Sequence, residues 1–543
     1  MSVTAAPEEP ASGRAPSRLA LDLVSPLPPV RTGIADYTVD LLPELARLCD
    51  VRLVRVDGQD VAAEIVERWH PAAMAETGRG GRIPFYQMGN NLHHERIHEL
   101  ALRRPGIVTL HDLFLHHLLI ERTLGRGDLD PYREELAFDH GWAGAAVAEP
   151  PRWGAYGTAC LFALPCNARL ARSQRGVLVH SRWARDQLLE DLPEVAVRVV
   201  PMPMPLAAEP DDGGRLETRR RLGIPETAPV LGSFGFQTPI KRTDRVIAAL
   251  ARAELRDTHL LIVGAVAREL DLDGAARSHG VADRVHVVGF LERDAMAAAM
   301  ATTDLCVNLR FPTAGETSAS LLRLLAMGRP TLVSDYAQFT DLPRDVVASV
   351  PIGDGEVEGI AATARALLDD RGRLRELGRR AREHIRREHD PARAARAIVE
   401  SCTELAGLAP GTPRPAAAPP PSTLTWGAIG GELRVENAER PWPEGARRTL
   451  TLRVRNSGRA RWLAGTRGAG GVAFEVRLLA GERDLLAGRP WPPLPSDLEP
   501  GAEVSLSIEL RRPLGRARLR IEPHVLGVAG ATALGGPVWE DEL

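Results

Sequence analysis

Short, continuous apolar runs alternate with helical stretches along most of the chain. The first series of runs is LALDLVS, VRLVRV, IPFYQMG, GIVTLHD and GVLVHS. After about Pro229 the rhythm restarts with PVLGSFG, HLLIVGA, RVHVVGF, LCVNL and PTLVS. Continuous apolar strands separated by helices are typical of parallel sheets that are covered on both faces. Two such series in succession predict an α/β protein with two doubly wound, Rossmann-like domains that face a cleft.

The last part of the chain changes to a period-two pattern. Apolar and polar residues alternate in LRVENAE, TLTLRVRNSG, VAFEVRLL, VSLSIELRR and RARLRIEPHVLG. This alternation, with turn signals between the runs, predicts an all-β sandwich. Five of the nine tryptophans fall in this part: Trp426, Trp442, Trp462, Trp491 and Trp539. Two interpretations stay open, because tryptophans fill cores and sheet ends but also stack on sugar rings.

These patterns divide the 543 residues into five segments. Residues 1–17 are expected to be a disordered leader, because they lack the basic start and apolar run of a secretory signal. Residues 18–203 are expected to form the first Rossmann-like domain, and residues 204–407 the second, together with its closing helices. Residues 408–423 are a linker rich in proline and alanine. Residues 424–543 form the sandwich.

Charge and cysteine usage exclude several classes of partner. The formal net charge of −3 gives no general attraction to nucleic acid. No apolar run reaches the roughly 18 residues of a membrane helix, although contact with a membrane surface stays open. The five cysteines are scattered, with neither zinc nor disulfide spacing. We therefore expect a cytoplasmic protein, with the cytoplasmic face of a membrane as one location.

One lysine stands out against the arginines. Lysine and arginine together number 68, yet Lys241 is the single lysine. It follows the strand PVLGSFG, where Gly235 opens a turn and Lys241 and Arg242 precede a helix. Two cations beside a helix N-terminus suit a diphosphate, and lysine is a compact point charge that arginine does not reproduce. The alternative is chance survival of a lysine at a solvated helix start.

Two turns of the first domain also carry candidate chemistry. Arg31, Thr32 and Gly33 precede a helix, and a glycine there lets backbone N–H groups approach an anion. No GxGxxG follows this strand, which argues against a dinucleotide-binding dehydrogenase. The strand GIVTLHD brings His111 and Asp112 to the sheet edge where ligands bind. His111 is suited to donate a hydrogen bond to a sugar, or alternatively caps a loop.

A third candidate element is LRFPTAGETSASLLRLLAMGRP. Arg310 ends a strand, and Gly315, Glu316, Thr317 and Ser318 form a polar turn before a helix. Thr317 or Ser318 is expected to cap that helix, whose first amides suit phosphate or sugar oxygens. Glu316 is suited to accept hydrogen bonds from sugar hydroxyls. The alternative is that Glu316 is an ordinary acid in the first helical turn.

Taken together, these motifs resemble those of glycosyltransferase family four, a large group of retaining enzymes with the GT-B fold. The resemblance covers residues 18 to about 405, through TGIADY, TLHD, GVLVHS, GSFGFQTPIKR, VHVVGF and PTAGETSASLLRLLAMGRP. It implies that Gly33 lies over the donor phosphates, that His111 reaches the transferred sugar and that Lys241 holds the diphosphate. It also implies that Glu316 grips the sugar, and that the closing helices cross back onto the first domain. The tail resembles an immunoglobulin-like sandwich.

Two departures from the family pattern place this chain in a divergent subgroup. The family commonly has Gly-Arg where this chain has Gly235 and Phe236, which leaves Arg242 as the substitute cation. The family also has two glutamates separated by seven residues. Their positions hold Gly315 and Arg323, with Glu316 next to the first. The second glutamate usually meets the ribose, so Arg323 belongs to the donor-binding set in its place.

The resulting hypothesis is a retaining hexosyltransferase. It moves a hexose from a nucleotide-diphosphate sugar to a glycan or lipid-linked acceptor, in surface polysaccharide or glycoconjugate synthesis. His111, Lys241 and Glu316 are the expected catalytic residues, and the donor phosphate takes the acceptor proton on the same face. We expect no cofactor and no metal, because no convincing DxD motif is present. Two other classes stay open, namely a non-catalytic protein that binds sugar nucleotides or glycans, and a sugar-nucleotide epimerase.

Overall fold

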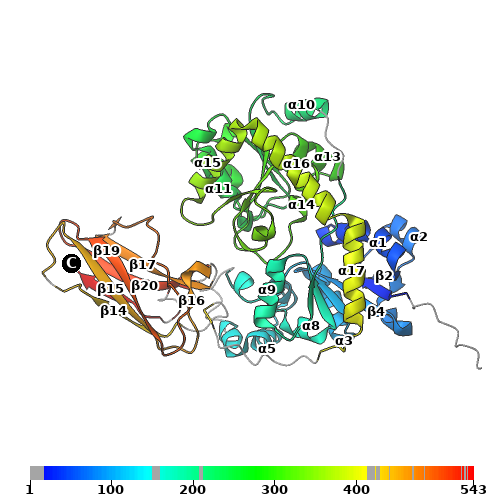
Figure 1. The fold of residues 1–543 in the computed structure, drawn as a ribbon, viewed down its shortest axis with the longest axis horizontal. Helices are drawn as coiled ribbons and strands as arrows, with labels where there is room; N and C mark the ends of the chain where they lie inside the picture. The colour runs from blue at the N-terminus through cyan, green and yellow to red at the C-terminus, as the bar shows by residue number, and fades with distance from the viewer. Residues whose placement is uncertain are drawn as a thin grey trace, which may run out of the picture.

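A computed structural model of the chain describes three folded parts (Figure 1). The described residues are 18–148, 159–206, 212–411, 422–423, 429–439, 441–467, 470–481, 483–527, 529–530, 534 and 536–543. The leader expected at residues 1–17 and most of the expected linker lie outside this set.

The first domain is built on one seven-stranded parallel sheet, with the order β3-β2-β1-β4-β5-β6-β7. Its strands are β1 (Ala20–Val24), β2 (Asp50–Arg55), β3 (Ala72–Ala73), β4 (Ile83–Met88), β5 (Ile107–Leu110), β6 (Gly176–Val179) and β7 (Val197–Val199). Its α-helices are α1 (Gly33–Leu48), α2 (Ala63–Trp69), α3 (Glu95–Arg103), α4 (His116–Arg122), α5 (Asp130–Val147), α7 (Cys160–Ala163), α8 (Ala168–Ser173) and α9 (Arg182–Asp191). The central strands are buried on both faces, which is why they read as unbroken apolar runs.

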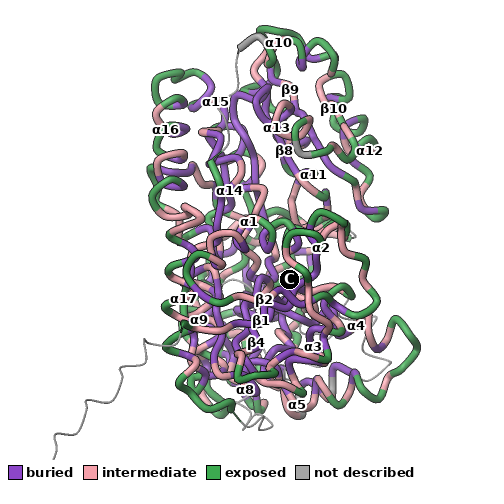
Figure 2. Tube along the Cα trace, turned by 90° about the vertical axis from the view of Figure 1, so that its right-hand side faces the viewer, coloured by how far each residue is buried: buried purple, intermediate pink, exposed green. Residues whose placement is uncertain are grey.

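The second domain repeats this architecture with a six-stranded parallel sheet, ordered β10-β9-β8-β11-β12-β13. Its strands are β8 (Val230–Phe234), β9 (His259–Val263), β10 (Val285–Val288), β11 (Leu305–Asn308), β12 (Thr331–Ser334) and β13 (Ala348–Val350). Its helices are α10 (Asp212–Arg221), α11 (Thr243–Leu250), α12 (Leu272–Ser278), α13 (Arg293–Ala301), α14 (Ala319–Ala326) and α15 (Glu356–Asp369). Figure 2 shows buried strands in purple through both domains. The predicted fold class is confirmed.

Two closing helices, α16 (Arg371–Glu388) and α17 (Pro391–Ala406), tie the domains together. Helix α17 packs against α1 of the first domain, as Figure 1 shows. Arg175 donates to the carbonyl of Ala406 at 3.1 Å, and Arg198 pairs with Glu404 at 2.9 Å. The last helix therefore crosses back onto the first domain, as the family resemblance implies.

One cluster of buried apolar side chains crosses between the two α/β domains. It joins Tyr37 and Leu41 of α1 to Leu321 and Leu325 of α14. Apolar burial contributes about 25 cal/mol per Å². Because this burial stabilises the contact, the cluster links the start of α14, where a sugar site was predicted, to the first domain.

The tail forms two facing β-sheets. One has the antiparallel order β14-β15-β19, and the other has the order β16-β17-β20-β21, with β18 pairing β17 and β22 pairing β20. The strands are β14 (Gly431–Glu436), β15 (Arg447–Asn456), β16 (Leu463–Ala464), β17 (Gly471–Ala480), β18 (Arg483–Asp484), β19 (Glu503–Arg511), β20 (Arg518–Val525), β21 (Ala529–Gly530) and β22 (Trp539–Glu542). The predicted all-β tail is confirmed.

The tail tryptophans divide between core and surface. Trp442 and Trp462 are buried in the sandwich, whereas Trp491 is 37% exposed. Trp539 is partly buried and Trp426 lies outside the described residues. The sandwich core is also continuous with buried apolar side chains of α4 and α5.

Among the described residues, no helix has both the length and the apolar character that spanning a bilayer requires.

Candidate functional site

The loops that follow β5 and β11 meet where the two parallel sheets face each other. The backbone N–H groups of Leu113 and Phe114 donate to the carbonyl of Ala314, at 2.8 and 3.0 Å. Gly315 has a φ of +78°, and a Cβ there would lie 2.5 Å from the Cβ of Leu113 and 3.1 Å from Trp183. Only glycine fits this contact. The position of the family's first glutamate is therefore a packing point between the domains.

Glu316, the next residue, is held by three groups of its own domain. Its Oε1 pairs with Arg310 at 2.8 Å, and its Oε2 accepts hydrogen bonds from the Thr313 hydroxyl and the Ala314 N–H, both at 3.0 Å. Both side chains of the pair are largely buried, at 10% exposure for Arg310 and 19% for Glu316. Helix α14 begins only at Ala319. The alternative of an ordinary first-turn acid is therefore wrong.

Thr317 and Ser318 were the two residues predicted to cap α14, and Ser318 is the one that does so. Its Oγ accepts from the N–H of Leu321 at 3.2 Å and lies 3.1 Å from the Oγ of Ser320. Thr317 precedes the cap and lines a cavity of about 450 Å³ between the domains. Other residues lining this cavity are His180, Arg182, Asp341 and His384.

Lys241 points back to the end of β8. Its Nζ donates to the carbonyl of Phe234 at 2.6 Å, and a Cβ at Gly235 would lie 2.8 Å from that nitrogen. Gly235, with a φ of +91°, therefore leaves the space that the ammonium group occupies. The pKa of Lys241 is lowered to about 7, mainly by burial and also by the charge of Arg310, while Glu316 opposes the decrease. Lys241, Arg310 and Glu316 thus form one electrostatic group.

Arg242 is not brought into this group. Its Nε donates to both carboxylate oxygens of Glu356, at 2.7 and 2.9 Å, and its guanidinium lies 5.5 Å from the ring centroid of Phe311. Glu356 is 1% exposed, so the pair joins the start of α11 to the start of α15. Arg323 lies partly buried on α14 and makes no side-chain ion pair within the described parts of the chain.

His111 lies in a cluster of rings on the first domain, in edge-to-face contact with Tyr37 and tilted against His180. Its ring centroid is 4.6 Å from Tyr37 and 5.1 Å from His180. Its Nε2 lies 2.9 Å from the side-chain oxygen of Gln87. With that oxygen as the acceptor, the proton is assigned to Nε2 and Nδ1 is the accepting nitrogen. Burial holds the pKa of His111 well below its usual range, so the ring is neutral at pH 7.

Asp112 faces the second domain from the same turn. The pKa of Asp112 is raised to about 7, mainly by burial and also by the negative charge of Glu316. The Asn90 N–H donates to its Oδ2 at 2.8 Å. A carboxyl group that titrates near neutral pH therefore lies within electrostatic reach of the Arg310–Glu316 pair.

Gly33 is the first residue of α1, and Thr32 caps this helix by accepting from the N–H of Ala35 at 3.1 Å. A Cβ at Gly33 would meet no atom within 4 Å. The glycine is therefore not demanded by packing, and its surface is open to a ligand. Next to it, Arg31 reaches across to the loop after β10, with its guanidinium 4.9 Å from the Phe290 ring centroid.

Sequence reasoning missed three features of this site. It did not pair Arg310 with Glu316, although the two residues lie six positions apart on one loop. It gave no role to Gln87, which fixes the proton position on His111. It also placed Asp112 at the sheet edge without anticipating that Glu316 would lie opposite.

The comparisons with known proteins agree with this architecture. Residues 228–370 match the family described as "Glycosyl transferases group 1". The sucrose-phosphate synthase of Thermosynechococcus elongatus has a similar fold, with a TM-score of 0.50, 17% identity and coverage of 72% of this chain and 99% of that one. HepE of Anabaena, solved in complex with UDP and glucose, has a TM-score of 0.51 at 14% identity and covers 71% of this chain and 100% of that one. The fold is GT-B.

Two curated relatives match a shorter part of the chain. The 2-deoxystreptamine glucosyltransferase of Streptomyces kanamyceticus is 29% identical over 185 residues, covering 32% of this chain and 46% of that protein. The D-inositol 3-phosphate glycosyltransferase of Nocardia farcinica is 27% identical over 182 residues, covering 32% of this chain and 40% of that protein. The match thus spans less than half the length of each relative.

Proposed function

We propose that this protein is a retaining glycosyltransferase that moves a hexose from a nucleotide-diphosphate sugar to a hydroxyl acceptor. The observation that carries the proposal is the group formed by Lys241, Arg310 and Glu316, which lies opposite Asp112, the residue after His111, across the interdomain contact. The three residues from the second domain fall within the matched range 228–370. Lys241 and the amides that begin α14 bind the diphosphate, and Glu316 accepts hydrogen bonds from sugar hydroxyls.

The proposed reaction needs positioning and charge stabilisation rather than a protein base. The bond between the anomeric carbon and the phosphate oxygen breaks, and its electron pair goes to the diphosphate. The acceptor oxygen forms the new bond on the same face, and its proton goes to a phosphate oxygen. Lys241 stabilises the departing diphosphate, and the neutral His111 accepts a hydrogen bond from the sugar at Nδ1. In this scheme the cleft needs no metal, and Arg242 acts as a structural residue.

The acceptor class follows from two sources of support. The two curated relatives are named for cyclitols, 2-deoxystreptamine and an inositol phosphate. The tail also resembles a sandwich that is appended to some enzymes of surface-polysaccharide assembly. The acceptors to be tested with this protein are therefore cyclitols, glycans and lipid-linked sugars. We propose that the reaction takes place in the cytoplasm.

A sugar-nucleotide epimerase is the second candidate function, and Asp112 is the observation that favours it. A carboxyl group whose pKa is raised to about 7 is suited to proton transfer at neutral pH. An epimerase needs such a group beside the sugar.

The test is to incubate the protein with a panel of nucleotide sugars, including UDP-glucose, with and without excess chelator. We expect slow release of nucleoside diphosphate without acceptor, faster release with the right acceptor, and no loss in chelator. An isomerised donor would support the epimerase instead. Binding seen as a thermal shift, with no turnover for any donor, would make the protein a sugar-nucleotide binder.

Donor affinity should fall as the pH rises above about 7. The lowered pKa of Lys241 means that its positive charge is lost above this pH, while Asp112 gains its negative charge over the same range. Both changes weaken binding of an anionic diphosphate, whose own charge is constant there. The dissociation constant, measured by calorimetry from pH 6 to 9, should rise by up to about tenfold per pH unit. In a Lys241→Ala variant, which carries no charge at this position at any pH, the contribution of the lysine to this pH dependence should disappear. A flat profile would contradict the assignment.

A further inference from the structure

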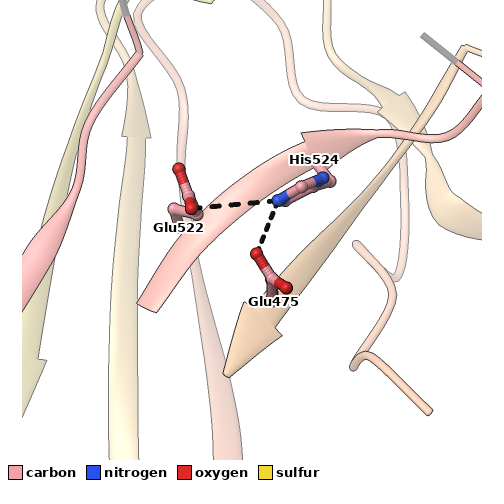
Figure 3. A group of neighbouring side chains, drawn as sticks. All are labelled: Glu475, Glu522 and His524. Atoms are coloured by element: carbon pink, nitrogen blue, oxygen red, sulfur yellow. Dashed lines mark hydrogen bonds and ion pairs between the residues drawn. The ribbon is translucent and has the colours of Figure 1, made fainter. Parts of the chain in front are cut away.

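Three side chains on the outer face of the tail converge far from the interdomain site. Strands β17 and β20 pair so that Glu475 lies directly opposite Glu522, and two rungs along, on the same face, His524 lies opposite Ala473. Phe474 and Ile521, which alternate with these residues, point into the sandwich core. Figure 3 shows the two carboxylates and the imidazole turned toward one another. Within the described residues, this is the one group of three or more histidine, cysteine or acidic side chains whose ligand atoms converge in this way.

The two carboxylates are unusual for an outward-facing pair. Their side chains are only 10% and 9% exposed, for Glu475 and Glu522. Like charges directly opposite each other on neighbouring strands are destabilising, and burial increases that cost. A cation bound between them would remove the repulsion.

Arginines compensate these charges in part, away from His524 at Glu475 but on the same oxygen that faces His524 at Glu522. Arg477 donates from Nε to the Oε1 of Glu475 at 2.8 Å, and Arg520 lies 3.4 Å from the Oε1 of Glu522. The Oε2 of Glu475 is turned instead to the imidazole. The Arg477 contact resembles the outer hydrogen bonds that orient metal-binding carboxylates.

The distances around His524 fit a tetrahedral ion. Its Nε2 lies 2.8 Å from the Oε2 of Glu475 and 3.9 Å from the Oε1 of Glu522, and all three ligand atoms lie within 4.8 Å of one another. Zinc bonds of about 2.0–2.2 Å to nitrogen and oxygen place tetrahedral ligands about 3.3 Å apart. The two distances bracket this value. The ring of Trp491, 4.4 Å from that of His524, restricts the orientation of the imidazole.

We propose that Glu475, Glu522 and His524 form a zinc-binding site in the tail. Three protein ligands of mixed nitrogen and oxygen type, with water as the fourth, suit zinc, whereas magnesium and calcium prefer oxygen ligands in larger number. On binding, the imidazole proton moves from Nε2 to Nδ1. The ion links β17 to β20 and stabilises the tail, and the site is independent of the sugar-transfer proposal.

The experiment is zinc titration of the full chain by calorimetry, after treatment with chelator and its removal. We expect one zinc ion per chain and a zinc-dependent rise in melting temperature, with no comparable effect of magnesium. His524→Ala and Glu522→Gln should each weaken zinc affinity at least tenfold. Glu540→Gln is the matched control, because Glu540 pairs with Arg520 on the same face but is not a ligand.

Melting curves without zinc show whether each variant is folded, and Glu522→Gln keeps the size and shape of the side chain. Zinc binding that is absent in the parent chain would overturn the proposal. Binding that is equally strong in the parent chain and in both folded ligand variants would also overturn it, because the ion would then bind elsewhere.

Discussion

Replacing Lys241 by alanine should lower the rate of sugar transfer by at least a hundredfold. The Nζ of Lys241 is held at the end of β8 by the Phe234 carbonyl, and within the described residues this is the one hydrogen bond it makes to protein. Two of its three N–H groups are thus left to bind a diphosphate. Removing a group that stabilises developing negative charge costs on the order of 10²–10³ in kcat. The measurement is the initial transfer rate, with kcat and KM determined separately.

Arginine should not replace this lysine functionally, although every other position with a lysine or arginine in this chain holds arginine. The ammonium group occupies the space that Gly235 leaves, where a Cβ would lie 2.8 Å from it, and the larger planar guanidinium should displace the diphosphate from this site. Arg310 also adds a like charge nearby, as the lowered pKa of Lys241 shows. The matched control is Arg245→Lys, at an exposed position of α11. If Lys241→Arg transferred sugar at the parent rate, the diphosphate would need another ligand.

The melting temperature of Lys241→Ala should show whether its loss of sugar transfer comes from the missing side chain or from misfolding. Because burial holds the pKa of Lys241 below its unfolded value, the folded chain binds fewer protons between about pH 7 and 10 than the unfolded chain. The charged lysine therefore opposes folding at neutral pH, and its effect weakens as the pH rises. Lys241→Ala should leave the melting temperature unchanged or raise it, while transfer is lost. A large fall in melting temperature would mean that the lysine is structural.

Much of this architecture was visible in the sequence because it depends on local patterns. Buried parallel strands such as Val230–Phe234 read as apolar runs, and the tail strands read as alternation. Lys241 stood out because it is the single lysine. The structure places it beside Arg310 and Glu316, all residues that the sequence assigned to the donor site.

The features that the sequence did not reveal depend on distant contacts. Arg242 was expected beside the diphosphate, yet it pairs with Glu356, 114 residues away. No local pattern encodes that pairing. The family resemblance places a glutamate at position 315, but here the glutamate is residue 316. The reason is a contact with the first domain, because Leu113 leaves space only for glycine at position 315. Sequence periodicity predicts elements, whereas these side-chain partners follow from how the elements pack.

Removing the charge of Glu316 should both lower transfer and move its pH dependence to lower pH. The carboxylate raises the pKa of Lys241 and of Asp112. In Glu316→Gln both groups should therefore lose their protons at lower pH, and donor affinity should begin to fall below pH 7. Glu316→Ala also removes the partner of the buried Arg310, which costs about 3 kcal/mol in stability. Its transfer rate should fall by about 10²–10³, as for loss of a positioned polar group. The measurements are rate and donor affinity from pH 5.5 to 9, with melting temperature.

Glu316→Gln is the decisive variant, because its side chain keeps an oxygen that accepts from the Ala314 N–H. The loop that contains residue 316 should therefore stay in place. Glu254→Gln, at an exposed position of the second domain, is the control for removing one negative charge. A general charge effect would move both profiles equally, and it is weak at an exposed site because salt screens it. If Glu316→Gln kept the parent profile and rate, Glu316 would be a packing residue of the interdomain loop, because neither its charge nor its second oxygen would then act on the sugar or on Lys241.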